Sequence, residues 1–148
     1  MYITKVSSVH FEIIDEGMDF HKSLMDKVIK SIDVCDHNNY HYIIFHMRDG
    51  NIYVMFHMQD CCEEVYLSDI TGSLDNLIGS PITMAEVATN NFNPPKHKEE
   101  DETHTWTFYK LATVKGYVTI RWCGISNGAY SEEVDFVSVE NLNIGECK

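Results

Sequence analysis

The strongest structural signal in the sequence is a pair of β-rich runs on either side of Asp49-Gly50, within residues 40–58. An Asp-Gly pair between alternating runs predicts a β-hairpin in which these two residues form the turn. Tyr42 would then lie opposite His57. This register places a wholly apolar set on one face, which is expected to be core: Ile43, Phe45, Met47, Ile52, Val54, Phe56 and Met58. The other face mixes Tyr, His, Arg and apolar residues, and is expected to meet solvent or another element.

A second hairpin is predicted around Lys115-Gly116, between residues 105–114 and residues 117–124. Alternation gives this hairpin one face that is expected to be core and one that is not. The core face carries Tyr109, Leu111, Thr113, Val118, Ile120 and Trp122, and the other carries Lys110, Ala112, Thr119 and Arg121. A third strand at residues 132–139 is predicted to lie beside residues 117–124, after a longer turn or a Gly bulge. Trp122 would then lie opposite Val134.

Helical signal is restricted to residues 19–25 and to a single turn at residues 73–78. Further strands are predicted at residues 65–70 and 82–87. Residues 90–102 read NNFNPPKHKEEDE and are predicted to be an exposed flexible loop. The whole chain of 148 residues is therefore expected to be one mainly β domain, with an α+β arrangement as the alternative. About seven to nine antiparallel strands and one or two short helices are expected.

The charge of the chain excludes one class of partner. Eleven Lys and Arg residues stand against 23 Asp and Glu residues, so the formal net charge is −12. Proteins that bind nucleic acid through phosphates use clustered basic residues, so direct nucleic-acid binding is not expected. Residues 49–95 and 122–147 contain no Lys or Arg. These basic-free stretches predict one or two acidic surfaces that attract a basic protein, unless they serve only solubility.

The sequence also predicts a compartment. Residues 1–10 do not resemble a secretory signal, and no apolar run is long enough to span a membrane. No membrane partner is therefore expected. The five Cys residues are odd in number and two of them are adjacent, which argues against a disulfide framework. A reducing cytoplasm is the expected setting, and no cofactor is expected.

The densest polar cluster, residues 57–64, reads HMQDCCEE. His57, Asp60 and Glu63 recur at intervals of three and are the candidate ligands of a metal ion. A second hypothesis is a thiol nucleophile at Cys61 or Cys62 activated by His57. The spacing matches no strong zinc motif. We therefore favour a strand end whose Cys residues pack as small hydrophobes.

A set of Tyr, His and basic side chains forms the candidate surface for a ligand or partner. Tyr and Arg are enriched in protein interfaces, and both can stack on a nucleobase. An ordinary amphipathic sheet face is the alternative interpretation. The candidates are Tyr42, His46, Arg48, Tyr53, His57, Lys110 and Arg121.

Two stretches resemble a known family. Residues 59–81 read QDCCEEVYLSDITGSLDNLIGSP, and residues 105–136 read TWTFYKLATVKGYVTIRWCGISNGAYSEEVDF. Their Cys-Cys-Glu and Trp-Thr-Phe-Tyr-Lys-Leu-Ala-Thr motifs resemble a family of small proteins of unknown function encoded by bacteriophages and prophages. The resemblance covers most of residues 27–137 and carries no catalytic residues. It implies a phage origin, an accessory role and the cytoplasm of an infected bacterium as the location.

Three functional hypotheses remain open. The first is a non-enzymatic phage accessory protein whose acidic surface binds and inhibits a host component, most concretely an anti-phage defence system. The second is a homo-oligomeric sponge that sequesters a nucleotide-derived immune signal. The third is a metal-dependent hydrolase that uses His57, Asp60 and Glu63.

Overall fold

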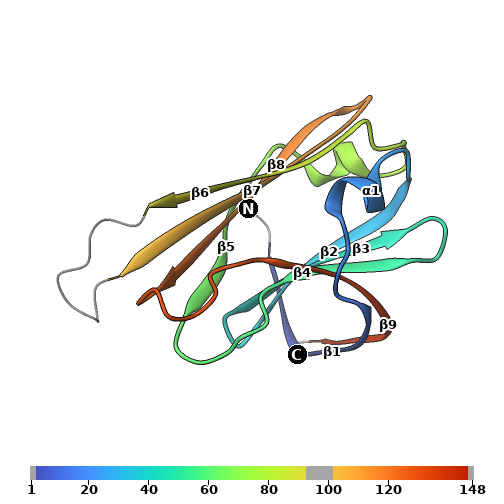
Figure 1. The fold of residues 1–148 in the computed structure, drawn as a ribbon. Helices are drawn as coiled ribbons and strands as arrows, with labels where there is room; N and C mark the ends of the chain where they lie inside the picture. Colours follow the sequence, from blue (N-terminus) through green and yellow to red (C-terminus); the bar gives the residue numbers. More distant parts are fainter. Residues whose placement is uncertain (1–2, 93–101, 147–148) are drawn as a thin grey trace.

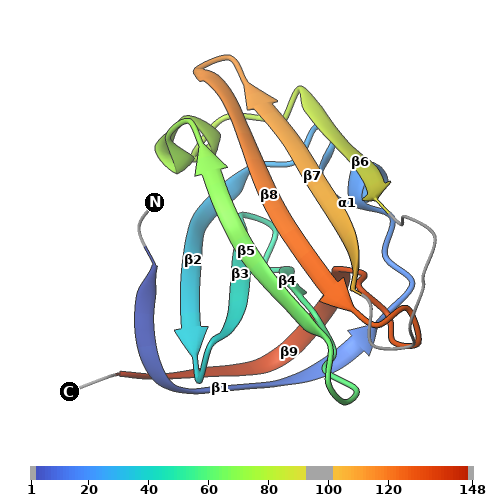
Figure 2. The ribbon, with the colours of Figure 1, turned by 90° about the vertical axis from the view of Figure 1, so that its left-hand side faces the viewer.

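A computed structural model describes residues 3–92 and 102–146. It confirms a mainly β protein with nine strands, one short α-helix and one 3-10 turn. The elements are β1 (Thr4–Asp15), α1 (Phe20–Leu24), β2 (Ile29–His37), β3 (Tyr40–Met47), β4 (Ile52–Phe56), β5 (Glu64–Thr71), η1 (Leu74–Leu77), β6 (Met84–Phe92), β7 (Thr103–Thr113), β8 (Gly116–Ser126) and β9 (Asp135–Glu146). They form a closed five-stranded barrel and a separate four-stranded sheet that lies across it (Figures 1 and 2).

The barrel follows the order β1-β2-β3-β4-β9. Its first and last strands, β1 and β9, pair antiparallel from Val6 opposite Glu146 to Asp15 opposite Ser138. β1 joins β2 as a parallel pair. This parallel pair departs from the wholly antiparallel expectation, and the connection that it needs passes through α1.

The sheet follows the order β5-β8-β7-β6, with the predicted hairpin β7–β8 at its centre. Thr113 pairs with Gly116, so the turn consists of Val114 and Lys115, one residue earlier than predicted, and the pairing register of the two strands differs by two residues from the prediction. A shift of two residues leaves every side chain on its predicted face, because side chains alternate with a period of two. The predicted core face is confirmed as buried: Tyr109, Leu111, Thr113, Val118, Ile120 and Trp122.

The hairpin β3–β4 differs from the prediction by one residue. Phe45 pairs with Tyr53, which makes Arg48, Asp49 and Gly50 a three-residue loop. Gly50 adopts a φ of 94°, a left-handed conformation that glycine accepts without a steric penalty. The slip moves every side chain of β4 to the opposite face. Tyr42 therefore stacks on Phe56, at a ring distance of 5.7 Å, and not against His57.

Both faces of β3 and β4 are buried because they separate two cores. One core fills the barrel and contains Val6, Cys35, Ile44, Val54, Phe56, Val137 and Val139. The other core lies between the barrel wall and the sheet, and includes Ile43, Phe45, Met47, Tyr53, Met55, Leu111, Ile120 and Trp122. The sequence left open whether the mixed face of this hairpin meets solvent or another element. In β4 the mixed face, with Tyr53 and Met55, is covered by the four-stranded sheet.

The predicted third strand of the sheet belongs to the barrel. β9 pairs with β4, where Phe136 lies opposite Met55, and not with β8. The expected pairing of Trp122 with Val134 is therefore wrong. Alternation in residues 132–139 predicted a strand, but alternation does not specify which strand lies beside it.

The shorter predicted elements are largely confirmed. Asp19 is the N-cap of α1, and its side chain accepts a hydrogen bond of 2.8 Å from the Lys22 backbone N–H. Ser73 precedes η1 without forming a side-chain cap. β6 continues to Phe92, so the first three residues of the predicted loop 90–102 are strand. Residues 93–101 of that loop lie outside the described residues.

Candidate functional site

A crevice of about 860 Å³ lies between the sheet and the start of β9. The inner faces of β6 and β7 form one wall, and residues 131–136, which lead into β9, form another. The inner face of β7 is apolar where it covers the barrel and changes to Thr105 and Thr107 where it lines the crevice. Because the hydroxyl groups of these threonines can face water, this end of the sheet does not have to pack against the barrel core, and the crevice lies between the two.

Among the described residues, the crevice is lined by five carboxylates and by no Lys or Arg. The carboxylates are Glu16, Asp19, Glu132, Glu133 and Asp135. Apolar and aromatic side chains also line it, namely Met18, Phe20, Val87, Tyr109 and Phe136. Burial, followed by the negative charges of Asp135 and Glu133, raises the pKa of Tyr109 far above its usual value. The crevice therefore combines an apolar surface with a negative potential.

Three of these carboxylates are held by the protein itself. Asp19 caps α1, and Asp135 accepts a hydrogen bond of 2.9 Å from the backbone N–H of Met58. Glu132 accepts hydrogen bonds from the hydroxyls of Thr103 and Ser126 through one oxygen, while its other oxygen is buried without a hydrogen-bond partner.

The other two carboxylates are available to a ligand. Glu16 and Glu133 are both exposed. Neither carboxylate has a hydrogen-bond or ion-pair partner in the part of the chain that the structure describes. These two side chains therefore supply charge that the protein does not neutralise.

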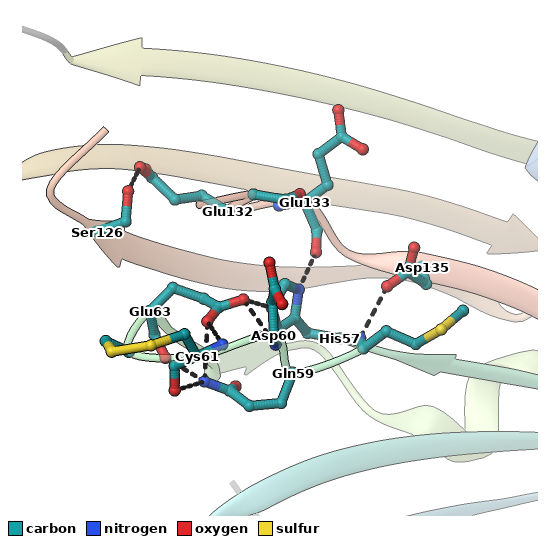
Figure 3. A network of polar contacts seen from close by, with 12 residues as sticks. His57, Gln59, Asp60, Cys61, Glu63, Ser126, Glu132, Glu133 and Asp135 are labelled. Atoms are coloured by element: carbon teal, nitrogen blue, oxygen red, sulfur yellow. Dashed lines mark hydrogen bonds and ion pairs between the residues drawn. A yellow bond between two sulfur atoms is a disulfide. The ribbon is translucent and has the colours of Figure 1, made fainter. Parts of the chain in front are cut away.

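A buried carboxylate, Glu63, lies beside the crevice at the centre of a polar network (Figure 3). Its side chain has no exposed surface. It accepts hydrogen bonds from His57 Nε2 at 2.8 Å, from the backbone N–H groups of Cys61 at 2.8 Å and Asp60 at 3.1 Å, and from Gln59 Nε2 at 3.1 Å. Four donors thus replace the water that burial removes.

Hydrogen bonding keeps Glu63 ionised in spite of its burial. Burial alone would raise the pKa of this carboxyl group, because it disfavours the charged form. The hydrogen bonds from Cys61, His57 and Asp60 outweigh that effect and lower the pKa from 4.5 to about 2. Glu63 is therefore a carboxylate at neutral pH.

His57 connects this carboxylate to the wall of the crevice. Its Nε2 atom contacts Glu63, and its Nδ1 atom lies 2.6 Å from the backbone oxygen of Glu133. Both partners are acceptors, so two N–H donors are required, and only the imidazolium form of histidine has both. We call residues 131–136, which contain Glu132, Glu133 and Asp135, the acidic segment. The His57 contact and the hydrogen bond from Met58 to Asp135 together fix this segment against the β4–β5 loop. We assign His57 and Glu63 a positioning role at the crevice.

Gly124 on β8 allows the acidic segment to lie close to the sheet. A Cβ atom at this position would come within 2.6 Å of the backbone oxygen of Glu132. Such a contact is shorter than real Cβ atoms tolerate, so a side chain here would push the segment away from β8. The glycine is therefore needed for the shape of the crevice wall.

The structure brings together two of the three predicted metal ligands. His57 and Glu63 are in contact, but Asp60 contributes only its backbone N–H to Glu63. In the described residues, no group of three or more His, Cys, Asp or Glu side chains is arranged to hold a metal ion. The ring nitrogens of His57 contact Glu63 and Glu133, so they also do not activate a neighbouring thiol.

Cys61 and Cys62 do not pack as small hydrophobes, contrary to the interpretation that we favoured. Both are exposed, and they are joined to each other by a disulfide. Their chain segment is a bend and not an extended strand. A bridge between adjacent residues encloses almost no chain, so it does not act as a framework disulfide. Cys35 and Cys123 are free and buried, and burial raises the pKa of the Cys35 thiol to about 11.

Alkylation of the folded protein should distinguish these cysteines. Iodoacetamide added after a phosphine reductant should label Cys61 and Cys62, because both are exposed, and leave Cys35 and Cys123 unlabelled. Without the reductant, Cys61 and Cys62 should also stay unlabelled. Peptide mass mapping after digestion measures each site. Labelling of Cys61 in the absence of reductant would contradict the disulfide.

The predicted Tyr, His and Arg surface is not a single surface. Tyr42 packs against the core inside the barrel, whereas Tyr53 belongs to the core beneath the sheet. His46 contacts Asp33 at 2.8 Å, and Arg48 is exposed in the β3–β4 loop. The tyrosines therefore cannot form one stacking platform.

Lys110 and Arg121 share the outer face of the sheet, as predicted. Arg121 lies opposite Phe108, next to Lys110 on β7, and its guanidinium carbon is 5.3 Å from the ring centre of Trp106. Neither cation lines the crevice. The acidic crevice was signalled in the sequence only through the basic-free stretch that contains Glu132, Glu133 and Asp135.

The fold and the site define a small β protein with a preformed acidic crevice. A family model described as a domain of unknown function, DUF7448, matches residues 22–136, and the chain belongs to this family. Membership agrees with the resemblance to a family of unknown function, while the phage origin stays a prediction. Neither the curated proteins nor the solved structures include a match. No helix in the described ranges is long and apolar enough to cross a membrane.

Proposed function

We propose that this protein is a non-enzymatic binding protein whose acidic crevice takes a basic segment of a partner protein. The observation that carries the proposal is the lining of the crevice, where the described residues supply five carboxylates and no Lys or Arg beside an apolar surface. Lys and Arg side chains suit such a site because their hydrocarbon stems cover apolar surface while their charged ends reach carboxylates. Complementary charge also speeds the encounter with a basic partner.

The same lining disfavours an anionic ligand. A nucleotide-derived signal would require local positive charge, and the two cations predicted for such a role, Lys110 and Arg121, lie on the opposite face of the sheet. Glu16 and Glu133 would repel a phosphate in the crevice. The crevice therefore suits a basic segment of a protein partner better than it suits an anionic nucleotide signal.

In the cell, we propose that the protein acts as a phage accessory protein that inhibits a host component. A defence nuclease that recognises nucleic acid carries basic segments, and an acidic crevice can occupy such a segment. The resemblance to phage-encoded proteins motivates this form, and the cytoplasm of the infected bacterium is the location that it requires. The crevice supports binding of a basic segment, whichever host protein supplies it.

Binding of a defined basic peptide tests the proposal. A fluorescein-labelled peptide of alternating Lys and Val should bind, and its affinity should fall as salt is added. Changing Glu16 and Glu133 together to Gln should weaken binding by about tenfold, because exposed ion pairs each contribute up to about 1 kcal/mol. Fluorescence anisotropy provides the measurement.

A matched pair of carboxylates serves as the control. Glu12 and Glu140 are exposed, lie opposite each other on β1 and β9, and do not line the crevice. Changing both to Gln alters the net charge by the same amount and should leave the affinity nearly unchanged. Equal losses in the two double variants would show a non-specific charge effect and overturn the proposal.

A further inference from the structure

Within the described residues, the edge of the sheet beside the crevice has backbone groups that no other strand pairs with. β6 is the last strand in the order β5-β8-β7-β6, and Figure 1 shows it along the outer edge of the sheet. In an antiparallel ladder, successive residues direct their N–H and C=O groups to alternate sides. Every second residue of β6 therefore points its backbone groups away from β7.

A contact with α1 identifies which residues these are. The ring Nδ1 of His21 donates to the backbone oxygen of Ala85 at 2.9 Å, so the backbone groups of Ala85 point away from β7. By the alternation, those of Val87 and Thr89 point the same way. His21 covers the edge at Ala85. From Val87 onward, no described element pairs with the side of β6 that faces away from β7.

The free edge and the acidic crevice meet at the same residues. Val87 and Thr89 both line the crevice. The Val87 side chain is 52% exposed although it lies on the face of β6 that covers the core at Ala85. An unpaired strand edge with an exposed β-branched side chain is a surface to which another strand can add.

We propose that the basic segment binds as an added β-strand along β6 at Val87 and Thr89, with its Lys or Arg side chains directed at the carboxylates of the crevice. This inference rests on the proposed function and specifies the conformation of the segment. Main-chain hydrogen bonds to the edge supply affinity that does not depend on sequence, and the carboxylates select for positive charge. Alternate residues of the segment face the crevice because side chains alternate along a strand.

Charge argues against a second copy of this chain as the occupant. Pairing of two β6 edges would bring two crevices together, each lined by Glu16, Glu132, Glu133 and Asp135 and by no Lys or Arg from the described part of the chain. Like charges in an interface oppose association. The net charge of −12 acts in the same direction.

Proline substitutions on β6 test the added strand. Val87→Pro and Thr89→Pro remove N–H groups that point to the free edge, and proline is tolerated in an edge strand at such positions. Each should weaken binding of the Lys-Val peptide at least tenfold. Val87→Thr and Thr89→Val keep the N–H and the branched shape, so each should lose less affinity than the proline variant at the same position. Thermal melting verifies that the proline variants are folded.

Hydrogen exchange gives a measurement that a general loss of structure does not imitate. Saturation with the Lys-Val peptide should slow exchange of the amides of Val87 and Thr89. A Lys-Pro peptide of equal charge, which lacks half of the strand donors, should bind at least tenfold more weakly. Sedimentation of the free protein should give a monomer, and a dimer that hides the β6 edge would overturn the inference.

The outcomes separate this inference from the proposed function. If the proline variants bind normally and only the variant with Gln at positions 16 and 133 is weakened, the basic segment binds by charge and the added strand is wrong. If the wild type does not bind the Lys-Val peptide, or if the Gln variant binds it as well as the wild type does, the acidic crevice itself is not the binding site.

Discussion

Replacing Glu63 with Gln should lower the free energy of unfolding by about 3 kcal/mol, because removal of one member of a buried ion pair leaves the other without its partner. His57 would retain its contact with Glu133 but would face an amide in place of a carboxylate. The neighbour Glu64 is exposed on β5 and provides the matched control. Its change to Gln should alter the free energy of unfolding by less than about 0.5 kcal/mol.

Urea denaturation followed by circular dichroism measures both variants. A loss in Glu63→Gln that is no larger than the loss in Glu64→Gln would contradict the buried ion pair. Glu63→Gln should also bind the Lys-Val peptide more weakly while Glu16 and Glu133 are intact, because the His57 ring that contacts the Glu133 backbone loses its carboxylate partner and is held less firmly. That readout distinguishes a positioning role from a purely structural one.

The pH dependence of stability gives an independent measure of Glu63. Its pKa is about 2 in the folded protein against 4.5 for the unperturbed group, so folding favours the ionised form. The contribution of Glu63 to stability is therefore complete above pH 4.5 and is lost as the pH falls toward 2. The difference in unfolding free energy between wild type and Glu63→Gln should narrow over this range. A difference that widens on acidification would reverse the sign of the expected linkage.

Replacing Trp122 with Ala should lower the free energy of unfolding by about 3–5 kcal/mol, the usual loss for a large buried aromatic side chain. Trp122 is 1% exposed in the core that joins the sheet to the barrel. Its indole N–H donates to the sulfur of Met55 on β4 at 3.1 Å, so it connects the two β units directly. Domains of this size have stabilities of about 5–15 kcal/mol, so the variant would retain only a part of the total.

Trp106 supplies the matched control for this prediction. It lies on β7, on the outer face of the same sheet, and is only partly buried beneath Arg121. Trp106→Ala should cost about 1 kcal/mol, the scale of an exposed cation–π contact. Where Trp122→Ala does not fold, Trp122→Phe should fold with an intermediate loss. Equal losses in the two alanine variants would contradict the role of Trp122 between sheet and barrel.

Local alternation predicted both hairpins, but it predicted the faces of only one of them correctly and did not predict the partner of β9. The faces of β7 and β8 were predicted correctly because the true register differs by an even number of residues. The faces of β4 were reversed because Gly50 permits a three-residue loop, and Asp-Gly is compatible with either loop length. The pairing of β9 with β1 and β4 joins residues far apart in the sequence, and no local pattern specifies such a pairing.

The candidate site was predictable in composition but not in geometry. The basic-free stretch near the C-terminus indicated an acidic surface, and it contains three of the crevice carboxylates. Glu16 and Asp19 come from the other end of the chain and join them only through the fold. The cluster around Glu63 was recognised as the densest polar segment, but its backbone donors are invisible in a sequence. The backbone N–H groups of Asp60 and Cys61 hold the Glu63 carboxylate in place, so the cluster has a structural role.

The pairing of β1 with β9 has a consequence for synthesis of the chain. β1 is synthesised well before β9, and until β9 emerges only Thr4 and Lys5 of β1 have strand partners, which are Cys35 and Asp36 of β2. The β7–β8 hairpin, by contrast, joins neighbouring segments and can form as soon as both have left the exit tunnel. Most of the backbone pairing of β1 therefore waits for β9, whereas its apolar side chains can be covered earlier, because Phe11 packs against Tyr42 and Phe56. The acidic crevice is consequently completed late in synthesis, because residues 131–136 form one of its walls.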